Sequence, residues 1–320
     1  MLARAFAVVV ALSAGAAQAQ PPGAAQGPAD ALGWLRKIYE ATQKLSYSGT
    51  FVYQSGERSE TSRITRYVDA NGDIEKLEVL DGTPREIVRT KNTVRCYLPG
   101  SKVVKVEHRS AERGFPALLP ARVSALSRNY EVSLGAPRRI AGYDCQAVVL
   151  TPKDELRYGY RLYADRSSGM LVKVVTVDPS GHDIEAIMFT QLRLGHVTRD
   201  MVRPRHTAGS WKIEDAAATP ATLDGWKVGV ELPGFDKVVE LRRRLESKPV
   251  RQIVYSDGLA AVSVFIEPLE GRTPPTGLAT LGAINIYTRE VAHHMVTVVG
   301  EAPAASVQRI ADGVEYQRPR

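Results

Sequence analysis

The spacing of apolar residues predicts one helix followed by a long series of strands. Residues 30–45 carry apolar side chains at helical intervals behind Asp30, a good N-terminal cap. From residue 47 the pattern changes to short β-rich stretches separated by turn signals such as Asn71-Gly72, Asp81-Gly82 and Pro99-Gly100. The expected strands are 47–53, 58–68, the two that Asn71-Gly72 and Asp81-Gly82 set off, 93–98, 102–107, 130–134, 143–151, 156–164, 171–178 and 184–194.

An apolar insert interrupts these strands at residues 109–129. Its run Phe115-Pro116-Ala117-Leu118-Leu119-Pro120 has no strand pattern and must cover an apolar surface. About ten strands with one helix and one such insert predict a large curved antiparallel sheet wrapped over helical elements. A concave sheet of this kind often encloses an apolar cavity.

A second unit follows residues 196–223, which have little periodicity and are interpreted as a linker. We expect the first domain to span residues 30–195 and a smaller domain to span residues 224–320, with strands at 226–232, 250–255, 259–267, 281–287 and 293–299. The segment 237–245 is ambiguous between helix and strand. A terminal helix is predicted from Pro303, with Val307, Ile310, Ala311 and Val314 on its buried side.

The N-terminus has the pattern of an export signal. Arg4 precedes the apolar stretch 5–12, and Ala17-Gln18-Ala19 offers the small-residue pattern of a cleavage site. We therefore expect a signal peptide at 1–19, a disordered leader at 20–29, and a soluble protein in the periplasm after cleavage. The alternative is a low-complexity, alanine-rich terminus.

The net charge of the chain indicates which classes of binding partner to expect. The 320-residue chain has a formal net charge of +7, which in the periplasm favours anionic lipid headgroups or an acidic protein segment over nucleic acid. The alternative is that the arginines only solvate strand faces.

No motif for catalysis or metal binding is present. The six histidines lack ligand spacing, and Ser256-Asp257-Gly258 is interpreted as a turn between two strands. We expect no cofactor, no metal and no enzyme activity, although Ser256 leaves open a hydrolase whose site is assembled in space.

The two cysteines, Cys96 and Cys145, are the expected disulfide of an exported chain. The alternative is two buried free thiols.

Four segments carry a resemblance to a known family. LDGTPREIVR (80–89), RYGYRLYAD (157–165), YSDGLAAVSVF (255–265) and VTVVGEAP (296–303) occur in the order of the motifs of the MucB/RseB family of periplasmic sigma-E regulators. Tyr163 stands where tryptophan is common in that family, and Ala302 occupies a variable position. The resemblance covers nearly the whole chain after the expected signal peptide.

This resemblance implies an α+β fold: a large N-terminal domain like the lipoprotein carrier LolA, a half-open antiparallel β-barrel with covering helices, and a smaller C-terminal α/β domain. It implies a regulator that binds the periplasmic part of a membrane anti-sigma factor and shields it from site-1 proteolysis. Lipid or lipopolysaccharide would release it. A carrier of lipids or lipoproteins of the LolA type is the alternative, and whether the protein forms homo-oligomers is left open.

Candidate residues can be named for a lipid-binding site and for the contact with the anti-sigma factor. Acyl chains need apolar walls, and the candidates for them are Phe51, Tyr53, Leu77, Val79, Tyr97, Tyr160, Leu162, Met188 and Phe189. The candidates for the anti-sigma contact are Arg242, Arg243, Arg244, Ser256, Asp257 and Gly258. For both sets the alternative is an ordinary structural role, in the core for the first and at the solvated surface for the second.

Overall fold

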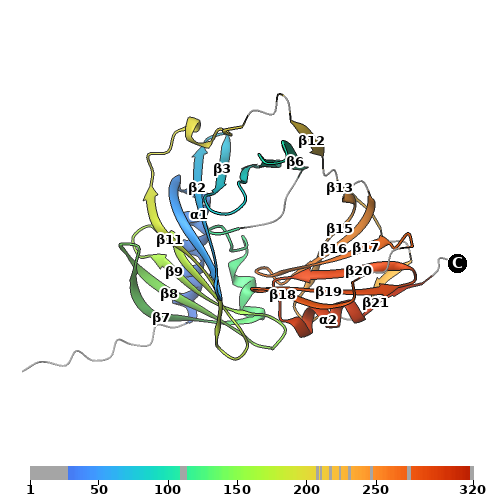
Figure 1. The fold of residues 1–320 in the computed structure, drawn as a ribbon. Coiled ribbons are helices and arrows are strands. Elements are labelled where there is room, and N and C mark those ends of the chain that lie inside the picture. The colour runs from blue at the N-terminus through green and yellow to red at the C-terminus, as the bar shows by residue number, and fades with distance from the viewer. Residues whose placement is uncertain are drawn as a thin grey trace, which may run out of the picture.

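The computed structural model of the protein consists mainly of two large β-sheets (Figure 1). It describes residues 28–108, 114–206, 209, 211–215, 218–222, 225–229, 232–245, 248–271 and 275–317. The predicted signal peptide and residues 20–27 of the predicted leader lie outside these ranges. Within them, no helix is both long and apolar enough to cross a bilayer. Helix α1 (Pro28–Lys44) begins two residues before Asp30, so the end of the predicted leader is helical.

The larger sheet has twelve strands, eleven of which follow α1 and are joined in antiparallel pairs. Its order is β12-β6-β5-β4-β3-β2-β1-β11-β10-β9-β8-β7, so β1 and β11 join its two halves. The edge strands β12 and β7 are not paired with each other, which confirms the predicted half-open barrel. The strands are β1 (Tyr47–Ser55), β2 (Arg58–Asp69), β3 (Gly72–Val79), β4 (Glu86–Thr90), β5 (Thr93–Leu98), β6 (Val103–His108), β7 (Tyr130–Ile140), β8 (Tyr143–Pro152), β9 (Gly159–Asp165), β10 (Leu171–Val177), β11 (Asp183–Leu194) and β12 (Lys212–Asp215).

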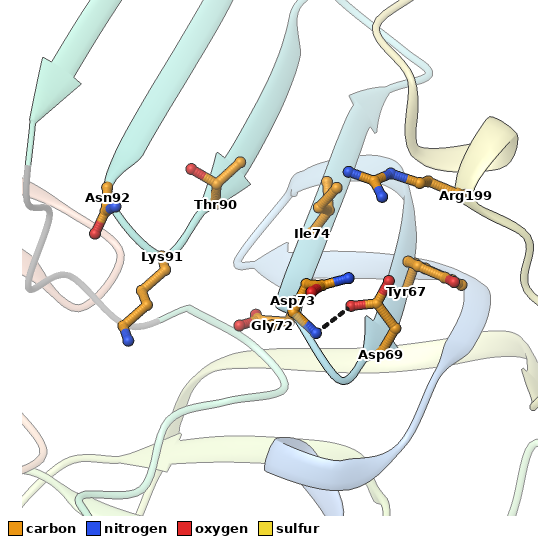
Figure 2. A pocket seen from close by; sticks show the side chains of 10 residues that line it. Tyr67, Asp69, Gly72, Asp73, Ile74, Thr90, Lys91, Asn92 and Arg199 are labelled. Carbon is orange, nitrogen blue, oxygen red and sulfur yellow. Dashed lines mark hydrogen bonds between the residues drawn. The ribbon is translucent and has the colours of Figure 1, made fainter.

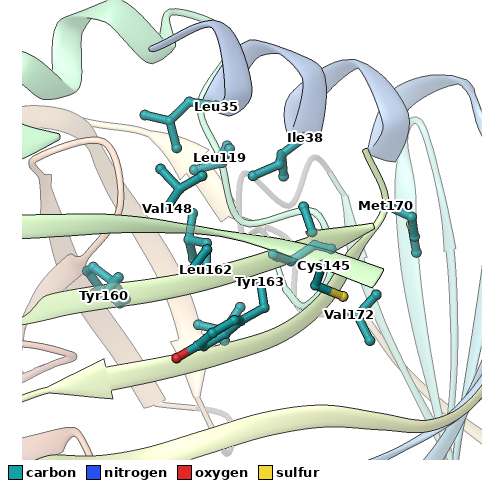
Figure 3. Close-up of a cluster of buried hydrophobic side chains, with 14 of the residues drawn as sticks. Leu35, Ile38, Leu119, Cys145, Val148, Tyr160, Leu162, Tyr163, Met170 and Val172 are labelled. Atoms are coloured by element: carbon teal, nitrogen blue, oxygen red, sulfur yellow. The ribbon is translucent and has the colours of Figure 1, made fainter. Parts of the chain in front are cut away.

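The two faces of this sheet have different coverings. The face that carries Phe51 and Phe189, here called the inner face, packs against α1 and the short helix η1 (Val123–Arg128). Leu35 and Ile38 are three residues apart and therefore lie on one side of α1. This side faces the sheet, and both residues are completely buried. Figure 3 shows both above Val148 and Leu162 of the sheet.

The opposite, outer face holds a smaller cluster of Val88, Tyr97 and Val104, against which Trp211 packs. Two buried carboxylates fasten the chain beside it: the backbone N–H of Arg205 donates to Glu86 at 3.0 Å, and the Arg205 guanidinium pairs with Glu78 at 2.8 Å. Burial raises the pKa of Glu86.

The segment predicted as a linker is therefore partly structured. It supplies the short helix η2 (Arg199–Val202), the edge strand β12 of the larger sheet, in parallel with β6, and the edge strand β13 (Ala218–Pro220) of the smaller sheet.

The smaller sheet has seven strands in the order β13-β15-β16-β17-β20-β19-β18. Helix α2 (Ala304–Asp312) covers one face, where Val264, Val298 and Ile310 are buried. The remaining strands are β15 (Asp236–Leu245), β16 (Lys248–Ser256), β17 (Ala261–Pro268), β18 (Gly277–Leu281), β19 (Ile284–Val291), β20 (His294–Gly300) and the separate pair β14 (Trp226–Val228) and β21 (Val314–Tyr316).

The segment 237–245, left open between helix and strand, is a strand. Two details differ from the expectation for this half. The single strand expected at 281–287 is the β18–β19 hairpin, because Gly282 turns the chain with a positive φ of 61°. Val314 is buried in β21 rather than in the terminal helix.

The predicted disulfide is wrong, because Cys96 and Cys145 are both free thiols. Cys96 lies on β5 and Cys145 on β8, and seven strands separate β5 from β8 in the sheet order. Burial raises the pKa of the Cys145 thiol to about 11.

Two glycines test this packing in opposite directions. Gly49 of β1 leaves room for the Phe189 ring, because a Cβ there would lie 2.6 Å from the ring and from the Gln191 carbonyl oxygen. Gly49→Ala should lower the free energy of unfolding by about 1–3 kcal/mol. Gly33 of α1 is exposed with open space around it, so Gly33→Ala should raise that free energy by about 0.5–1 kcal/mol. Chemical denaturation measures both, and shifts of the same sign would contradict the assigned contacts.

Candidate functional site

Seven of the nine candidate wall residues share the inner face. The registers of β1, β2, β3, β9 and β11 place them there, since side chains alternate between faces along a strand. The Phe51 and Phe189 ring centroids are 6.0 Å apart in an edge-to-face arrangement. The seven are Phe51, Tyr53, Leu77, Val79, Tyr160, Leu162 and Phe189.

Tyr97 and Met188 lie on the outer face, so the expectation that all nine share one face is wrong. The Tyr97 ring packs against Trp211 at a centroid distance of 6.3 Å, and Met188 is paired with Val52, the neighbour of Phe51. The period of two in a strand separates the faces without telling which one is inside.

Side chains from the insert cover the inner face at Phe51 and Phe189. Phe115 and Leu119 from the insert are buried there, with exposed fractions of 6 % and 3 %. The Phe115 ring centroid lies 5.4 Å from that of Phe51 and 4.9 Å from that of Phe189. The candidate acyl-chain site is thus occupied by aromatic and aliphatic side chains of the protein.

Two surface hollows lie elsewhere on the larger sheet. Figure 2 shows one of them, between the β2–β3 turn, the β4–β5 turn and η2, where Asn71 N donates to the Asp69 carboxylate at 2.8 Å. The second lies on the outer face between Lys76, Glu78 and Arg205. Mostly polar and charged side chains line both, which does not suit an acyl chain.

The junction between the two sheets contains a completely buried ion pair. Arg157, between β8 and β9, has no exposed surface, and its guanidinium Nη1 lies 2.9 Å from Oδ2 of Asp257. Asp154 accepts two further bonds from this guanidinium, at 2.9 and 3.0 Å, and the Pro233 carbonyl accepts one at 2.5 Å. The guanidinium also lies over the Phe235 ring, 4.9 Å from its centroid.

Asp257 is equally well satisfied. Its carboxylate accepts the Tyr130 hydroxyl at 2.8 Å and the backbone N–H groups of Leu259 and Ala260 at 2.9 Å each. Burial, with the neighbouring Tyr160 and Asp257, raises the pKa of Tyr130 far above its usual range. A buried charge of this kind is tolerated because each charged group has several partners.

Further contacts complete the junction at the β18–β19 turn. The backbone N–H of Ala283 donates to Glu185 of β11 at 3.2 Å, and the Tyr53 hydroxyl donates to the same carboxylate at 2.9 Å. Burial and this bond raise the pKa of Tyr53 to about 12. Asn285 of β19 donates to the Tyr158 hydroxyl at 2.9 Å. In Figure 1 the edge of the smaller sheet that carries β18 accordingly lies beside the larger sheet.

The candidates for the anti-sigma contact are divided by the fold. The turn Ser256-Asp257-Gly258 lies in this junction, and the side chain of Asp257 is completely buried. Arg243 points across the junction and donates to Glu107 of β6 at 2.7 Å. Arg242 and Arg244, on the other side of β15, are exposed.

Sequence reasoning missed the role of Arg157 and Tyr130. In the sequence Arg157 stands as the first residue of RYGYRLYAD, and Asp154 at a spacing of three is its one local partner signal. Its second partner, Asp257, is one hundred positions away, and no local pattern joins the two.

Comparison with known proteins identifies the family. The profile of the MucB/RseB N-terminal domain matches residues 30–218, and that of the MucB/RseB C-terminal domain matches residues 220–315. The chain belongs to the MucB/RseB family. The sigma factor AlgU regulatory protein MucB of Pseudomonas aeruginosa is 32% identical over 298 residues, which cover 88% of this chain and 90% of that protein.

Other members are similar over a comparable length. The sigma-E factor regulatory protein RseB of Escherichia coli is 24% identical over 288 residues, covering 88% of this chain and 89% of that protein. The crystal structure of MucB in complex with MucA(peri) covers 91% of this chain and 100% of that chain, with 28% identity and a TM-score of 0.70. The MucB/RseB motifs RYGYR and YSDG meet in the buried pair of Arg157 and Asp257.

The buried pair should dominate the effect of nearby substitutions on stability. Arg157→Met leaves the Asp257 carboxylate buried without its cation and should lower the free energy of unfolding by about 3–5 kcal/mol. Arg161→Met, in the same motif, removes a half-exposed partner of Asp183 and should lower it by less than about 1 kcal/mol. Chemical denaturation gives both values.

The double variant Arg157→Met with Asp257→Asn distinguishes the ion pair from packing. The loss in free energy of unfolding should be smaller than the sum of the losses in the two single variants. The second change removes the buried charge that the first change leaves without a partner. Strict additivity would contradict the pairing.

Proposed function

We propose that this protein is a periplasmic negative regulator of a sigma-E-type envelope stress response. It binds the periplasmic part of a membrane anti-sigma factor and shields it from the first proteolytic cleavage. The observation that carries this proposal is the likeness over 91% of the chain to MucB crystallised with MucA(peri). In this proposal the protein acts by binding rather than by catalysis.

The surface of the smaller sheet supports an electrostatic contribution to this binding. Arg242 and Arg244 project from one side of β15, and Arg251 of β16 is paired with Arg242 on the same side. Clustered cations accelerate association with an acidic segment and stabilise the complex modestly at an exposed rim. The buried Asp257 and the inward Arg243 hold this surface in place instead of contacting the partner.

Lipid or lipopolysaccharide is proposed as the releasing signal. The apolar inner face supplies the type of surface that acyl chains bind, and its seven candidate residues come from strands of both halves of the sheet. If lipid lowers the affinity for the anti-sigma segment by some factor, that segment lowers the affinity for lipid by the same factor.

Titration calorimetry with the periplasmic segment of the organism's anti-sigma factor tests the proposal. The full chain without its signal peptide should bind saturably, and added lipopolysaccharide should weaken the binding. Absence of binding with and without lipid would overturn the proposal and favour a lipid or lipoprotein carrier.

The contribution of the basic surface is tested by charge reversal. Arg242→Glu with Arg244→Glu should weaken binding on the order of tenfold, with a smaller effect at high salt. Arg138→Glu with Arg139→Glu, two exposed positions on the edge strand β7, makes the same change in net charge and should leave the affinity unchanged. Equal effects of the two pairs would exclude a local contact at β15.

A further inference from the structure

The insert that interrupts the strands occupies the inner face as a ligand would. Phe115, Leu119, Val123 and Leu126 are all at least 94% buried, although their segment, 115–126, contains no strand. Figure 3 places Leu119 between Leu35 and Ile38 of α1 and Val148 of the sheet. The side chains of this segment thus fill the space between the helix and the sheet.

This segment is held mainly through apolar side chains. The backbone hydrogen bonds described for it are short-range: Leu118 N donates to Pro116 O at 3.0 Å, and Ala125 N donates to Arg122 O at 2.9 Å. The attraction of apolar surface is non-directional and is the same for a side chain and for an acyl chain. Phe115 and Leu119 together match about four to eight methylene groups in apolar burial. A chain of about twelve carbons therefore has enough apolar surface to replace them.

The far end of the same segment touches the smaller sheet. A Cβ at Gly258 would lie 3.4 Å from Leu126 Cδ2 and 3.7 Å from Pro120 Cγ, so the β16–β17 turn rests directly on the segment. Leu259 packs into the core of the larger sheet. Asn129, which follows η1, donates to the Gly234 carbonyl at 3.2 Å. Displacement of the segment would remove support from residues 256–259.

We infer that residues 115–126 are a built-in occupant of an acyl-chain site on the inner face, and that a displacing chain is sensed by the smaller sheet through the contact of Leu126 with residues 256–259. The ligand class is a long, unbranched acyl chain, either free or as part of a lipid. The effect of the acyl chain on anti-sigma binding rests on the proposed function. The displacement of residues 115–126 by an acyl chain does not depend on it.

Hydrogen exchange on the intact chain tests the displacement. cis-Parinaric acid, a fluorescent fatty acid, is added to saturation, and amide exchange is followed by mass spectrometry. Exchange in peptides covering residues 115–128 should become at least several-fold faster. Saturable binding of the probe with unchanged or slower exchange there would overturn the inference while leaving lipid binding intact. Competition of the bound probe by dodecanoate or by lipopolysaccharide distinguishes a free fatty acid from a lipid acyl chain.

Leu259→Ala tests the transmission. This variant should bind cis-parinaric acid within about twofold of the unmodified protein, but the factor by which the probe weakens anti-sigma binding should fall towards one. Leu278→Ala, an exposed leucine on β18, should retain the full factor. A full factor in Leu259→Ala would overturn the transmission.

The remaining outcomes separate the inference from the proposed function. Anti-sigma binding without any binding of the probe or lipopolysaccharide would reject the acyl-chain site and lipid release, and leave the anti-sigma contact standing. Faster exchange at 115–128 in a protein that does not bind the anti-sigma segment would support the displacement and reject the proposed function.

Discussion

An open, strongly curved sheet must have its apolar inner face covered by something other than itself. The twelve-stranded sheet does not close, since β12 and β7 remain unpaired with each other. Its inner face is covered by α1, by residues 115–126 of the insert, and at one end by Leu259 from the smaller sheet. Because the smaller sheet supplies part of the core of the larger one, the two sheets are not independent units joined by a tether.

The polar contacts at the junction fix how the sheets meet. Arg157 and Asp257 are both buried, and such pairs add little net stability because desolvation offsets their attraction. Their effect is on geometry, since any other docking of the smaller sheet would leave a buried charge without partners. The segments 157–165 and 255–265, whose residues Arg157 and Asp257 are one hundred positions apart, thereby meet in one structural role.

The sequence allowed most strands to be predicted, but not their faces or their long-range partners. The short strands β12 and β13 lie in the segment predicted as a linker, and β21 holds Val314, which was expected in the terminal helix. Turn signals such as Asn71-Gly72 and Pro99-Gly100 mark hairpins that are present in the structure. Alternation along β5 and β11 could not tell that Tyr97 and Met188 point outward, because a period of two has no inside or outside. The bulge between Lys237 and Val239 breaks the alternation in β15, which agrees with the ambiguity of that segment.

Errors at longer range have a different origin. The proposed disulfide rested on compartment and residue count, and sheet order, which separates Cys96 from Cys145, is not encoded in local pattern. The insert's phenylalanine and leucines have no strand pattern of their own, which predicts that it covers an apolar surface, and the burial of Phe115 and Leu119 confirms this. That it fills the space expected to be a cavity follows only from the three-dimensional arrangement.

The two ends of the junction constrain how a change at the inner face can spread. On one side, β12 and β13 fasten the same short stretch of chain to both sheets, and Arg243 bonds to Glu107. On the other side, the pair of Arg157 and Asp257 fixes the β16–β17 turn. With both ends held, the sheets cannot slide freely past each other when the packing between them changes. A disturbance of the insert is therefore concentrated at the turn it touches, residues 256–259. This turn connects β16, the neighbour of the strand β15 that carries Arg242 and Arg244, to β17, which carries core residues of the smaller sheet.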